Sequence, residues 1–417
     1  MIVILADDLT GASDAAAQFA QRGYDTRLCI DHGQIDSCAE VIALTADNRH
    51  VTSKNAYEAA RTTLLPFTHS LSRLFIKIDS TMRGPILAHI AGALSVFDDS
   101  CPAHPAGGGQ ALICPAYPEM GRQVIDQVVL IDQVPVAQTA IGDDPVTTVS
   151  SSNMPEMLGC ERFAGRTQHS SKIGEISVVP LTPNGDWTTT LGEALAAGVR
   201  VATADAATRQ DLMDIADALT KFPEIVPVGS AGLAQECARI WTNANPVVSE
   251  PASHDLTPTV VLISSCHPAS KIQLDSFLAH QPPRTVVLTS GNADSLGTRI
   301  SDADVVIVVR PEERTEQATD LAGLLGRATA YLARNINAQS LILVGGDGAR
   351  ATLDSLGVTE LRVNEPVAEG IGSMTALDGL PGVLVVTKAG GFGGPDALTT
   401  MVIHCQGFIP PDDKEKL

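Results

Sequence analysis

Short runs of Val, Ile and Leu alternate with Ala-rich segments of helical length along the chain. Unbroken apolar runs are typical of strands that are buried on both faces of a parallel sheet, and the segments between them suit helices that cover the sheet. The pattern therefore predicts an α/β fold. The predicted strands of the first half are 2–6, 26–30, 41–44, 74–78, 111–114, 176–179, 199–202 and 225–228, and the predicted helices include 12–22, 54–65 and 209–221.

The alternation stops at residues 245–258, which carry three prolines and little periodicity. Such a composition is typical of a linker between domains. We therefore predict two α/β domains, 1–247 and 258–417, each with a mainly parallel sheet flanked by helices. After the linker we expect strands at 259–264, 285–288, 305–309, 340–344 and 383–387 and a helix at 316–335, whereas 103–110 and 141–174 are predicted to be irregular.

Ligands of open α/β sheets bind beyond the carboxyl ends of the strands, so the strand-to-helix turns are the first places to look for a site. Asp7 and Asp8 follow the first predicted strand, and Thr10 stands in the same turn. A carboxylate there could accept the proton of a substrate hydroxyl or help to hold Mg²⁺. Capping of the next helix by Ser13 or Asp14 is the alternative explanation.

The turn after strand 74–78 holds a dense set of polar residues. Lys77 and Asp79 project from one face of the strand, and Ser80 and Arg83 follow. The Arg83 guanidinium could bind a carboxylate through two hydrogen bonds. An ion pair between Lys77 and Asp79, with hydroxyls that cap the next helix, is the alternative.

After strand 111–114, two prolines make a rigid turn that could aim Arg122.

Small residues mark further turns. Residues 229–232 lead from a strand into a helix, where free N–H groups would suit an anion and close helix packing would explain the glycines nearly as well. In the second domain, Gly346, Asp347 and Gly348 follow strand 340–344, and Gly390 and Gly391 follow strand 383–387. Such turns let the backbone approach phosphate groups closely.

These glycine turns are compatible with either of two classes of nucleotide, a dinucleotide such as NAD or a nucleoside triphosphate such as ATP. Residues 346–351 fit Gly-x-Gly-x-x-Ala, a dinucleotide signature, although they sit late in the domain. The chain has no Gly-x-x-x-x-Gly-Lys-Ser/Thr, which excludes a Walker-type kinase. The turns of the two domains together predict a nucleotide in the second domain and a small acid in the first.

The charge and the cysteine content of the chain limit which binding partners and which cellular location we expect. There are 28 Lys+Arg against 48 Asp+Glu, a net charge of −20, which excludes nucleic acid and anionic membranes as bulk partners. A few well-placed cations can still bind a small anion, and we expect ATP to bind as its magnesium complex. The eight cysteines show no zinc spacing, and the sequence shows neither a signal peptide nor a membrane-spanning run, so we expect a cytoplasmic protein.

The motif order resembles that of the four-carbon acid sugar kinase family, which phosphorylates threonate, erythronate or 3-oxo-tetronate with ATP. The resemblance rests on motifs at 6–14, 77–84, 115–122, 229–233 and 388–393, and so covers essentially the whole chain. It implies an N-terminal domain that holds the sugar acid, a C-terminal domain that holds ATP, and an active site in the cleft between them. By position it implies ATP contact by Ser265, Gly346, Asp347, Gly348 and Gly390, and substrate contact by Asp7, Asp8, Lys77, Asp79 and Arg83.

The resulting hypothesis is an ATP- and Mg²⁺-dependent kinase that acts on the C4 hydroxyl of a four-carbon sugar acid. Arg83, with Lys77 or Arg122, would hold the substrate carboxylate, and Asp8, Asp7 or Asp79 would accept the hydroxyl proton. The metal ligands, the stereochemistry of the substrate and the oligomeric state stay open, with a homodimer as one option. The alternatives are an NAD-dependent hydroxy-acid oxidoreductase that uses residues 346–351 and a non-catalytic sugar-acid sensor.

Overall fold

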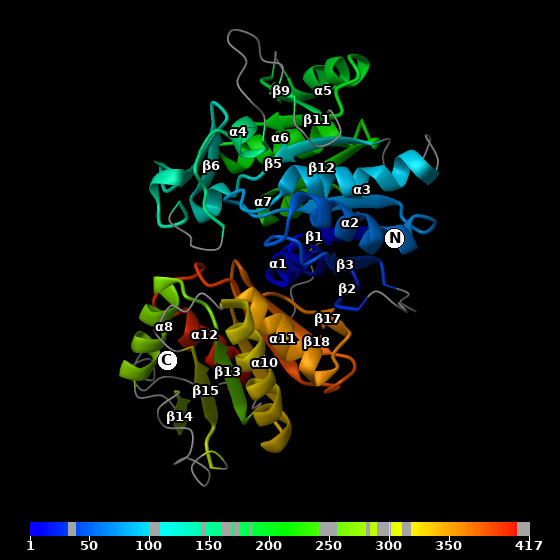
Figure 1. The fold of residues 1–417 in the computed structure, drawn as a ribbon. Coiled ribbons are helices and arrows are strands. Elements are labelled where there is room, and N and C mark those ends of the chain that lie inside the picture. Colours follow the sequence, from blue (N-terminus) through cyan, green and yellow to red (C-terminus); the bar gives the residue numbers. More distant parts are fainter. Residues whose placement is uncertain are drawn as a thin grey trace. The chain divides into compact units, whose positions relative to one another are not determined.

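The computed structural model of the protein forms two compact units (Figure 1), each described here by itself. Unit 1 comprises Met1–Tyr24 and Asp36–Pro246, and unit 2 comprises Asp25–Ile35 and Val247–Leu417. The structure describes residues 1–31, 39–100, 109–142, 147–159, 169–170, 176–183, 186–241, 257–280, 284–289, 300, 302–310 and 318–406. The predicted linker at 245–258 lies almost entirely outside these residues, as do most of the predicted irregular segment at 103–110 and half of that at 141–174. The described half of 141–174 is not all irregular, since it contains the short helix Met154–Met157 and the two-residue strand His169–Ser170.

The sheet of unit 1 has the strand order β3-β1-β4-β12-β5-β11-β10-β9. All of its pairs are parallel except the last, between β10 and β9. The central strands are buried on both faces, which explains why they are apolar without alternation. The bounds are β1 Ile2–Ala6, β3 Val41–Thr45, β4 Arg73–Lys77, β5 Gln110–Cys114, β9 His169–Ser170, β10 Ser177–Leu181, β11 Val201–Ala204 and β12 Ile225–Gly229.

The helices of unit 1 pack on this sheet and on one another. Helix α1 packs against α7, α2 against α3, and α6 against both α5 and α7. Their bounds are α1 Leu9–Ala20, α2 Ser53–Leu64, α3 Ile86–Ser100, α4 Met154–Met157, α5 Trp187–Ala196, α6 Arg209–Leu219 and α7 Ala231–Trp241, with short 3₁₀ turns at Leu65–Phe67, Pro118–Met120 and Val136–Gln138.

Helix α1 differs from its prediction because of its N-cap. The sequence predicts a helix at 12–22, whereas α1 begins at Leu9. The carboxylate of Asp8 accepts a hydrogen bond from the Gly11 N–H and so caps the helix three residues earlier than the Ala-rich stretch suggests. The alternative explanation, capping by Ser13 or Asp14, is wrong, since both residues lie inside the helix.

A three-stranded antiparallel sheet, β6-β7-β8, follows β5 and was not predicted from the sequence. Its strands are β6 Arg122–Ile125, β7 Val128–Ile131 and β8 Val134–Pro135. Two-residue turns join them, and the residues of these turns, Asp126–Gln127 and Asp132–Gln133, have φ values between 48° and 68°. Such turns usually carry Asn-Gly or Asp-Gly. Here Gln occupies the second left-handed position, so the turn residues did not predict these hairpins.

The sheet of unit 2 has the order β14-β15-β13-β16-β19-β18-β17-β2. The five strands from β14 to β19 are parallel, and each of the remaining pairs is antiparallel. The strands are β2 Thr26–Cys29, β13 Thr259–Ile263, β14 Thr285–Leu288, β15 Val305–Val309, β16 Ser340–Val344, β17 Glu360–Val363, β18 Ile371–Ala376 and β19 Leu384–Lys388.

Helices cover both faces of this sheet. On one face, Phe277 of α8 and Met401 of α12 pack with Val305 and Ile307. On the other face, Leu332 of α10 packs with Val306, since neighbouring strand residues point to opposite faces. The bounds are α8 Pro268–Ala279, α10 Ala318–Asn335, α11 Gly346–Leu356 and α12 Ala397–Gln406.

The strand predicted at 26–30 belongs to unit 2, although it lies near the start of the chain. Its residues form β2, which pairs with β17 in an antiparallel register that sets Leu28 opposite Leu361. An apolar run shows that a strand forms but not which sheet edge it joins, because any exposed edge offers the same backbone groups. A division of the sequence at one linker therefore assigns residues 25–35 to the first domain, whereas the structure places them in unit 2.

The structure confirms the predicted α/β class with a mainly parallel sheet in each unit. The predicted helix at 316–335 corresponds to α10, and the strands predicted at 285–288 and 305–309 coincide with β14 and β15. Among the described residues, no helix is both long enough and apolar enough to cross a membrane.

Candidate active site

Three neighbouring strands of unit 1 bring charged residues to one edge of the sheet. The order β3-β1-β4 places the residues that follow these strands side by side at their carboxyl ends. Asp7 and Asp8 follow β1, Arg49 stands four residues beyond β3, and Lys77 and Asp79 stand at the end of β4 and just beyond it. We call these residues, together with Arg83 and Arg122, the carboxylate–arginine cluster.

Arg49 joins the two aspartates of the first turn. Its Nε and Nη2 donate to the two carboxylate oxygens of Asp7 at 3.0 and 2.8 Å. Its Nη1 and Nη2 donate to Asp8 at 2.6 and 2.9 Å. One guanidinium therefore bridges two adjacent carboxylates and reduces the repulsion between them in a partly buried place.

Asp8 has a second set of donors in its own turn. The Thr10 hydroxyl donates to Asp8 Oδ2 at 2.8 Å, and the Gly11 N–H donates to Asp8 Oδ1 at 2.7 Å. A Cβ at Gly11 would lie 2.6 Å from that oxygen and 3.1 Å from Lys77 Nζ, so glycine is needed for this close approach. Burial raises the pKa of Asp8, but Arg49, Lys77 and these hydrogen bonds together hold it below its usual value.

Asp79 forms the second half of the cluster with Arg83. Arg83 Nε and Nη2 donate to its two carboxylate oxygens at 2.8 and 3.1 Å, and the Thr81 hydroxyl also donates to it. Burial raises the pKa of Asp79, but Arg83 and Arg49 hold it well below its usual range. Asp79 thus pairs with Arg83, and the alternative of a Lys77–Asp79 ion pair is wrong; the Lys77 ammonium instead donates to the Ile78 carbonyl at 3.1 Å.

The remaining predicted substrate residues lie around these pairs. Ser80 is buried next to Asp79. Arg122 begins β6, and its guanidinium donates to the Met120 carbonyl. Burial lowers the pKa of Arg122, while the charges of Asp132 and Asp79 act in the opposite direction, so Arg122 lies within electrostatic reach of Asp79.

The three carboxylates differ in their access to a ligand. The side chain of Asp8 is 18% exposed, against 5% for Asp7 and 10% for Asp79. Asp8 is therefore the member of the cluster that a substrate hydroxyl reaches most easily.

The turn after β12 is explained by close packing. A Cβ at Gly232 would lie 2.6 Å from the Ala116 carbonyl oxygen, and the Ser230 hydroxyl donates to the same oxygen at 2.9 Å. The Gly232 N–H in turn donates to Ser230 Oγ at 3.2 Å. These contacts hold the turn after β5, which carries Arg122, and favour the packing explanation over an anion site at residues 229–232.

A buried ion network supports the same turn. Glu236 of α7 has a side chain that is 0% exposed and accepts hydrogen bonds from Arg209 Nε at 2.9 Å and Arg239 Nε at 2.7 Å. Arg209 also donates to Glu119, which lies in the turn before Arg122, at 3.1 Å. Glu236 therefore ties α6 and α7 to this turn.

We expect Glu236→Gln to lower the free energy of unfolding by about 1–3 kcal/mol, because it weakens two charge-assisted hydrogen bonds at a buried acceptor. Urea unfolding of the purified variant measures this. Asp217→Asn is the matched control: its carboxylate pairs with the same Arg239 but is 59% exposed, and its loss should change stability by less than about 0.5 kcal/mol. Equal losses in both variants would contradict the role given to Glu236.

In unit 2, the predicted nucleotide residues meet at the carboxyl ends of β13, β16 and β19, which are adjacent in the sheet. Ser264 and Ser265 follow β13, Gly345–Gly348 follow β16, and Gly390 and Gly391 follow β19. Gly345 has φ 108°, and a Cβ on it would lie 2.6 Å from Ser264 Oγ. A Cβ on Gly390 would overlap Ser265 Oγ, so the turns interlock and tolerate no side chain there.

Two helices begin at this edge. Helix α11 starts at Gly346, with Asp347 exposed in its first turn, and α8 starts at Pro268 after His267, whose Nδ1 accepts from the Ala269 N–H at 3.2 Å. Helix N-termini with exposed N–H groups favour anions. The residues present therefore fit the phosphates of a nucleotide. Lys388 at the end of β19 is buried, and burial lowers its pKa to about 8.

Arg49 is the principal residue that the sequence did not single out. Three polar residues, Asp47, Asn48 and Arg49, follow the predicted strand 41–44, and this was the signal that could have found it. The signal was weak because the strand order is not visible in the sequence: only its place beside β1 brings the end of β3 to Asp7 and Asp8.

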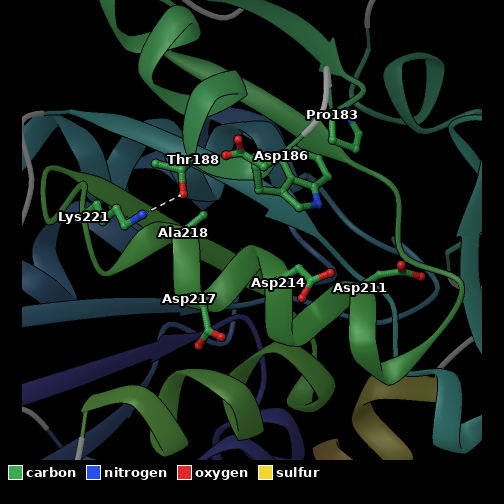
Figure 2. Close-up of a pocket in the computed structure, with 9 residues that line it drawn as sticks. Pro183, Asp186, Thr188, Asp211, Asp214, Asp217, Ala218 and Lys221 are labelled. Atoms are coloured by element: carbon green, nitrogen blue, oxygen red, sulfur yellow. Dashed lines mark hydrogen bonds between the residues drawn. The ribbon is translucent and has the colours of Figure 1, made fainter.

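A separate hollow of unit 1 lies between α5 and α6 (Figure 2) and holds none of the predicted site residues. Its acids have partners within the protein: Asp186 is the N-cap of α5, Asp211 completes the capping box of α6, Asp214 accepts from Gln210, and Asp217 pairs with Arg239. Within the described ranges, no cluster of three or more His, Cys, Asp or Glu side chains has the geometry of a metal site. The hollow is therefore not a second candidate site.

Comparisons with known proteins place this geometry in a family. A family described as Sugar-binding N-terminal domain matches residues 2–237, and one described as Nucleotide-binding C-terminal domain matches residues 260–398. A D-threonate kinase of Bordetella bronchiseptica is 30% identical, with 95% of each chain covered. A 3-oxo-tetronate kinase of Burkholderia multivorans is 24% identical, with 94% of each chain covered.

Solved structures agree at the level of the fold. A Haemophilus influenzae protein superposes with a TM-score of 0.70 at 18% identity, covering 97% of this chain and 99% of that one. The two matched domains and the charged strand ends define a two-domain sugar-binding and nucleotide-binding protein. The chain belongs to the four-carbon acid sugar kinase family. This confirms the predicted family and the predicted class of enzyme, a kinase.

Proposed function

We propose that the protein transfers the γ-phosphoryl group of ATP to the C4 hydroxyl of a four-carbon sugar acid: threonate, erythronate or 3-oxo-tetronate. The observation that carries the proposal is the charge of the carboxylate–arginine cluster. Its four cations, Arg49, Lys77, Arg83 and Arg122, face the carboxylates Asp7, Asp8 and Asp79, and Asp132 acts on Arg122 as well. The formal charges balance, and cations gathered at the ends of neighbouring strands can still bind the carboxylate of a small acid.

Each residue has a role in this proposal. Arg122 and Lys77 bind the substrate carboxylate, together with Arg83, which Asp79 holds in place. Thr10 and Ser80 offer hydroxyls to the polyol. Asp8 accepts the C4 proton, because it is ionised, the most exposed of the three acids and fixed by Arg49 and Gly11. Phosphoryl transfer demands orientation of the hydroxyl more than a strong base.

Unit 2 holds the nucleotide in this proposal. Ser265, Gly346, Asp347, Gly348, Gly390 and Gly391 surround the phosphates at the N-termini of α8 and α11. ATP would supply the phosphoryl group, and Mg²⁺, which keeps several waters and needs few protein ligands, would neutralise its charge.

The test is a screen of the threonate and erythronate isomers and their 3-oxo forms with MgATP and coupled detection of ADP. We expect ADP formation with at least one acid and none without it. Thermal shifts provide the control: MgATP should raise Tm, and NAD(H) should not. Stabilisation by NAD(H) alone would favour an oxidoreductase, and binding of a sugar acid without any turnover would favour a sensor.

A further inference from the structure

The loop after β19 has its carbonyl groups turned toward buried side chains. The Lys388 ammonium donates to the carbonyls of Ala389, Gly390 and Phe392 at 2.9, 3.1 and 3.0 Å. Lys388 is only 1% exposed. Its three donors thus have three acceptors within the loop, and the ammonium points into the protein.

Helix α8 holds the rest of the loop in the same way. The Ser270 hydroxyl donates to the Gly390 carbonyl at 3.1 Å. Gln273 Nε2 contacts the carbonyls of residues 392, 393 and 394 at 2.9, 2.9 and 3.1 Å. Ser270 and Gln273 are both 2% exposed. Five of the six carbonyls from residue 389 to residue 394 therefore accept from these three side chains.

Peptide planarity fixes where the N–H groups go. In a trans peptide, the carbonyl of one residue and the N–H of the next point in opposite directions. The inward carbonyls of residues 389, 390, 392 and 393 therefore turn the N–H groups of residues 390, 391, 393 and 394 outward. Within the described chain, none of these four N–H groups, all from glycine, has a protein acceptor. They form two consecutive pairs, separated by the Phe392 N–H, which donates to the Ala389 carbonyl at 3.2 Å. Consecutive outward N–H groups can form a nest for an anion.

We propose that Lys388, Ser270 and Gln273 are positioning residues that hold this loop with its N–H groups outward, so that Gly390, Gly391, Gly393 and Gly394 bind a phosphate group of the nucleotide. The inference rests on the proposed nucleotide site. It gives the lysine of this glycine-rich turn an indirect role, because its ammonium binds the loop carbonyls from inside. The lysine of a Walker-type loop, in contrast, reaches the phosphates itself.

The test compares Lys388→Met, Gln273→Leu and the milder Ser270→Ala with the wild type. Loop exchange is measured as hydrogen exchange of the Phe392 N–H, which donates to the Ala389 carbonyl at 3.2 Å, in the full-length protein without ligand. Calorimetry measures the affinity for pyrophosphate and ADP. Gln406→Leu is the matched control. Gln406 is also a buried glutamine of unit 2, but its Nε2 donates to Thr259 Oγ1 and the Asp304 carbonyl, next to the amino ends of β13 and β15.

We expect Lys388→Met and Gln273→Leu to speed loop exchange about tenfold or more without ligand and to weaken pyrophosphate binding by about 10–100-fold, since each removes several hydrogen bonds. Ser270→Ala should act in the same direction by less than about tenfold. In catalysis, the KM for ATP should rise more than kcat falls. Gln406→Leu should lower Tm and leave loop exchange and pyrophosphate affinity within about twofold of wild type.

Weaker pyrophosphate binding in Lys388→Met with unchanged loop exchange would overturn the proposal, because it would show direct contact between the ammonium and the phosphate. Unchanged affinity in both Gln273→Leu and Ser270→Ala would overturn it as well. A wild-type protein that binds pyrophosphate and ADP through this loop but phosphorylates no sugar acid would refute the proposed function and leave the positioning role intact.

Discussion

Asp8→Asn should lower kcat by about 10²–10⁴-fold while the protein stays folded, because an amide cannot accept the C4 proton. Asparagine caps helices as well as aspartate does, so the start of α1 at Leu9 should survive. Its side-chain oxygen can still accept from Arg49. The KM for ATP should change little, since the nucleotide residues lie in unit 2.

Steady-state kinetics with the acid found in the screen, together with the Tm of the variant, measure this prediction. Asp214→Asn is the control: Asp214 is an exposed acid of α6 that accepts from Gln210, and its loss should leave kcat within about twofold. If Asp8→Asn retains more than a tenth of the wild-type kcat, Asp8 is not the base, and Asp7 or Asp79 would be the candidate instead. The Asn variants of those two residues would then be compared.

Arg49→Met should lower the free energy of unfolding by about 3–5 kcal/mol at pH 7, because it leaves Asp7 and Asp8 adjacent, partly buried and without their common cation. Arg49→Lys keeps the charge but cannot reproduce the four hydrogen bonds of the guanidinium, so its loss should be smaller. Urea unfolding at several pH values measures both variants.

The sign of the pH dependence follows from the pKa shifts. In the wild type, Arg49 helps to hold the pKa of Asp8 and Asp79 below the unfolded value of 3.8, so the stability from these groups is present above that pH and is lost as pH falls through the folded pKa. Without Arg49, Asp8 loses the main cation that opposes the effect of burial on its pKa, whereas Arg83 still lowers the pKa of Asp79. Protonation of Asp8 at lower pH then relieves its repulsion with Asp7. The difference between wild type and Arg49→Met should therefore shrink as pH falls from 7 toward 4. A difference that is constant with pH would show that the loss comes from packing alone.

Local patterns in the sequence were sufficient for much of the fold. The strand predicted at 2–6 is β1 to the residue, and the predicted strand 340–344 is β16, because unbroken apolar runs occur where both faces of a strand are covered. The helix at 12–22 was misplaced by three residues because Asp8 was considered as a catalytic acid and not as a cap. The strands β6 to β8 were missed because their turns lack glycine.

The sequence by itself determined that this is an α/β protein with acids after its first strand, a polar turn after residue 78 and glycine turns near the ends of two later strands. These are local properties, set by apolar runs and by the glycines and charged residues that follow them directly in the sequence. The tertiary structure alone decided that β3 lies beside β1, so that Arg49 binds Asp7 and Asp8. It also decided that Asp79 pairs with Arg83, that β2 joins unit 2, and that Lys388 faces into its own loop. The positions of β3 and β2 depend on strand order, and residues tens of positions apart carry no local signal of it. Asp79 and Arg83, like Lys388 and its loop, are close in the sequence, but burial decides which partner each side chain meets.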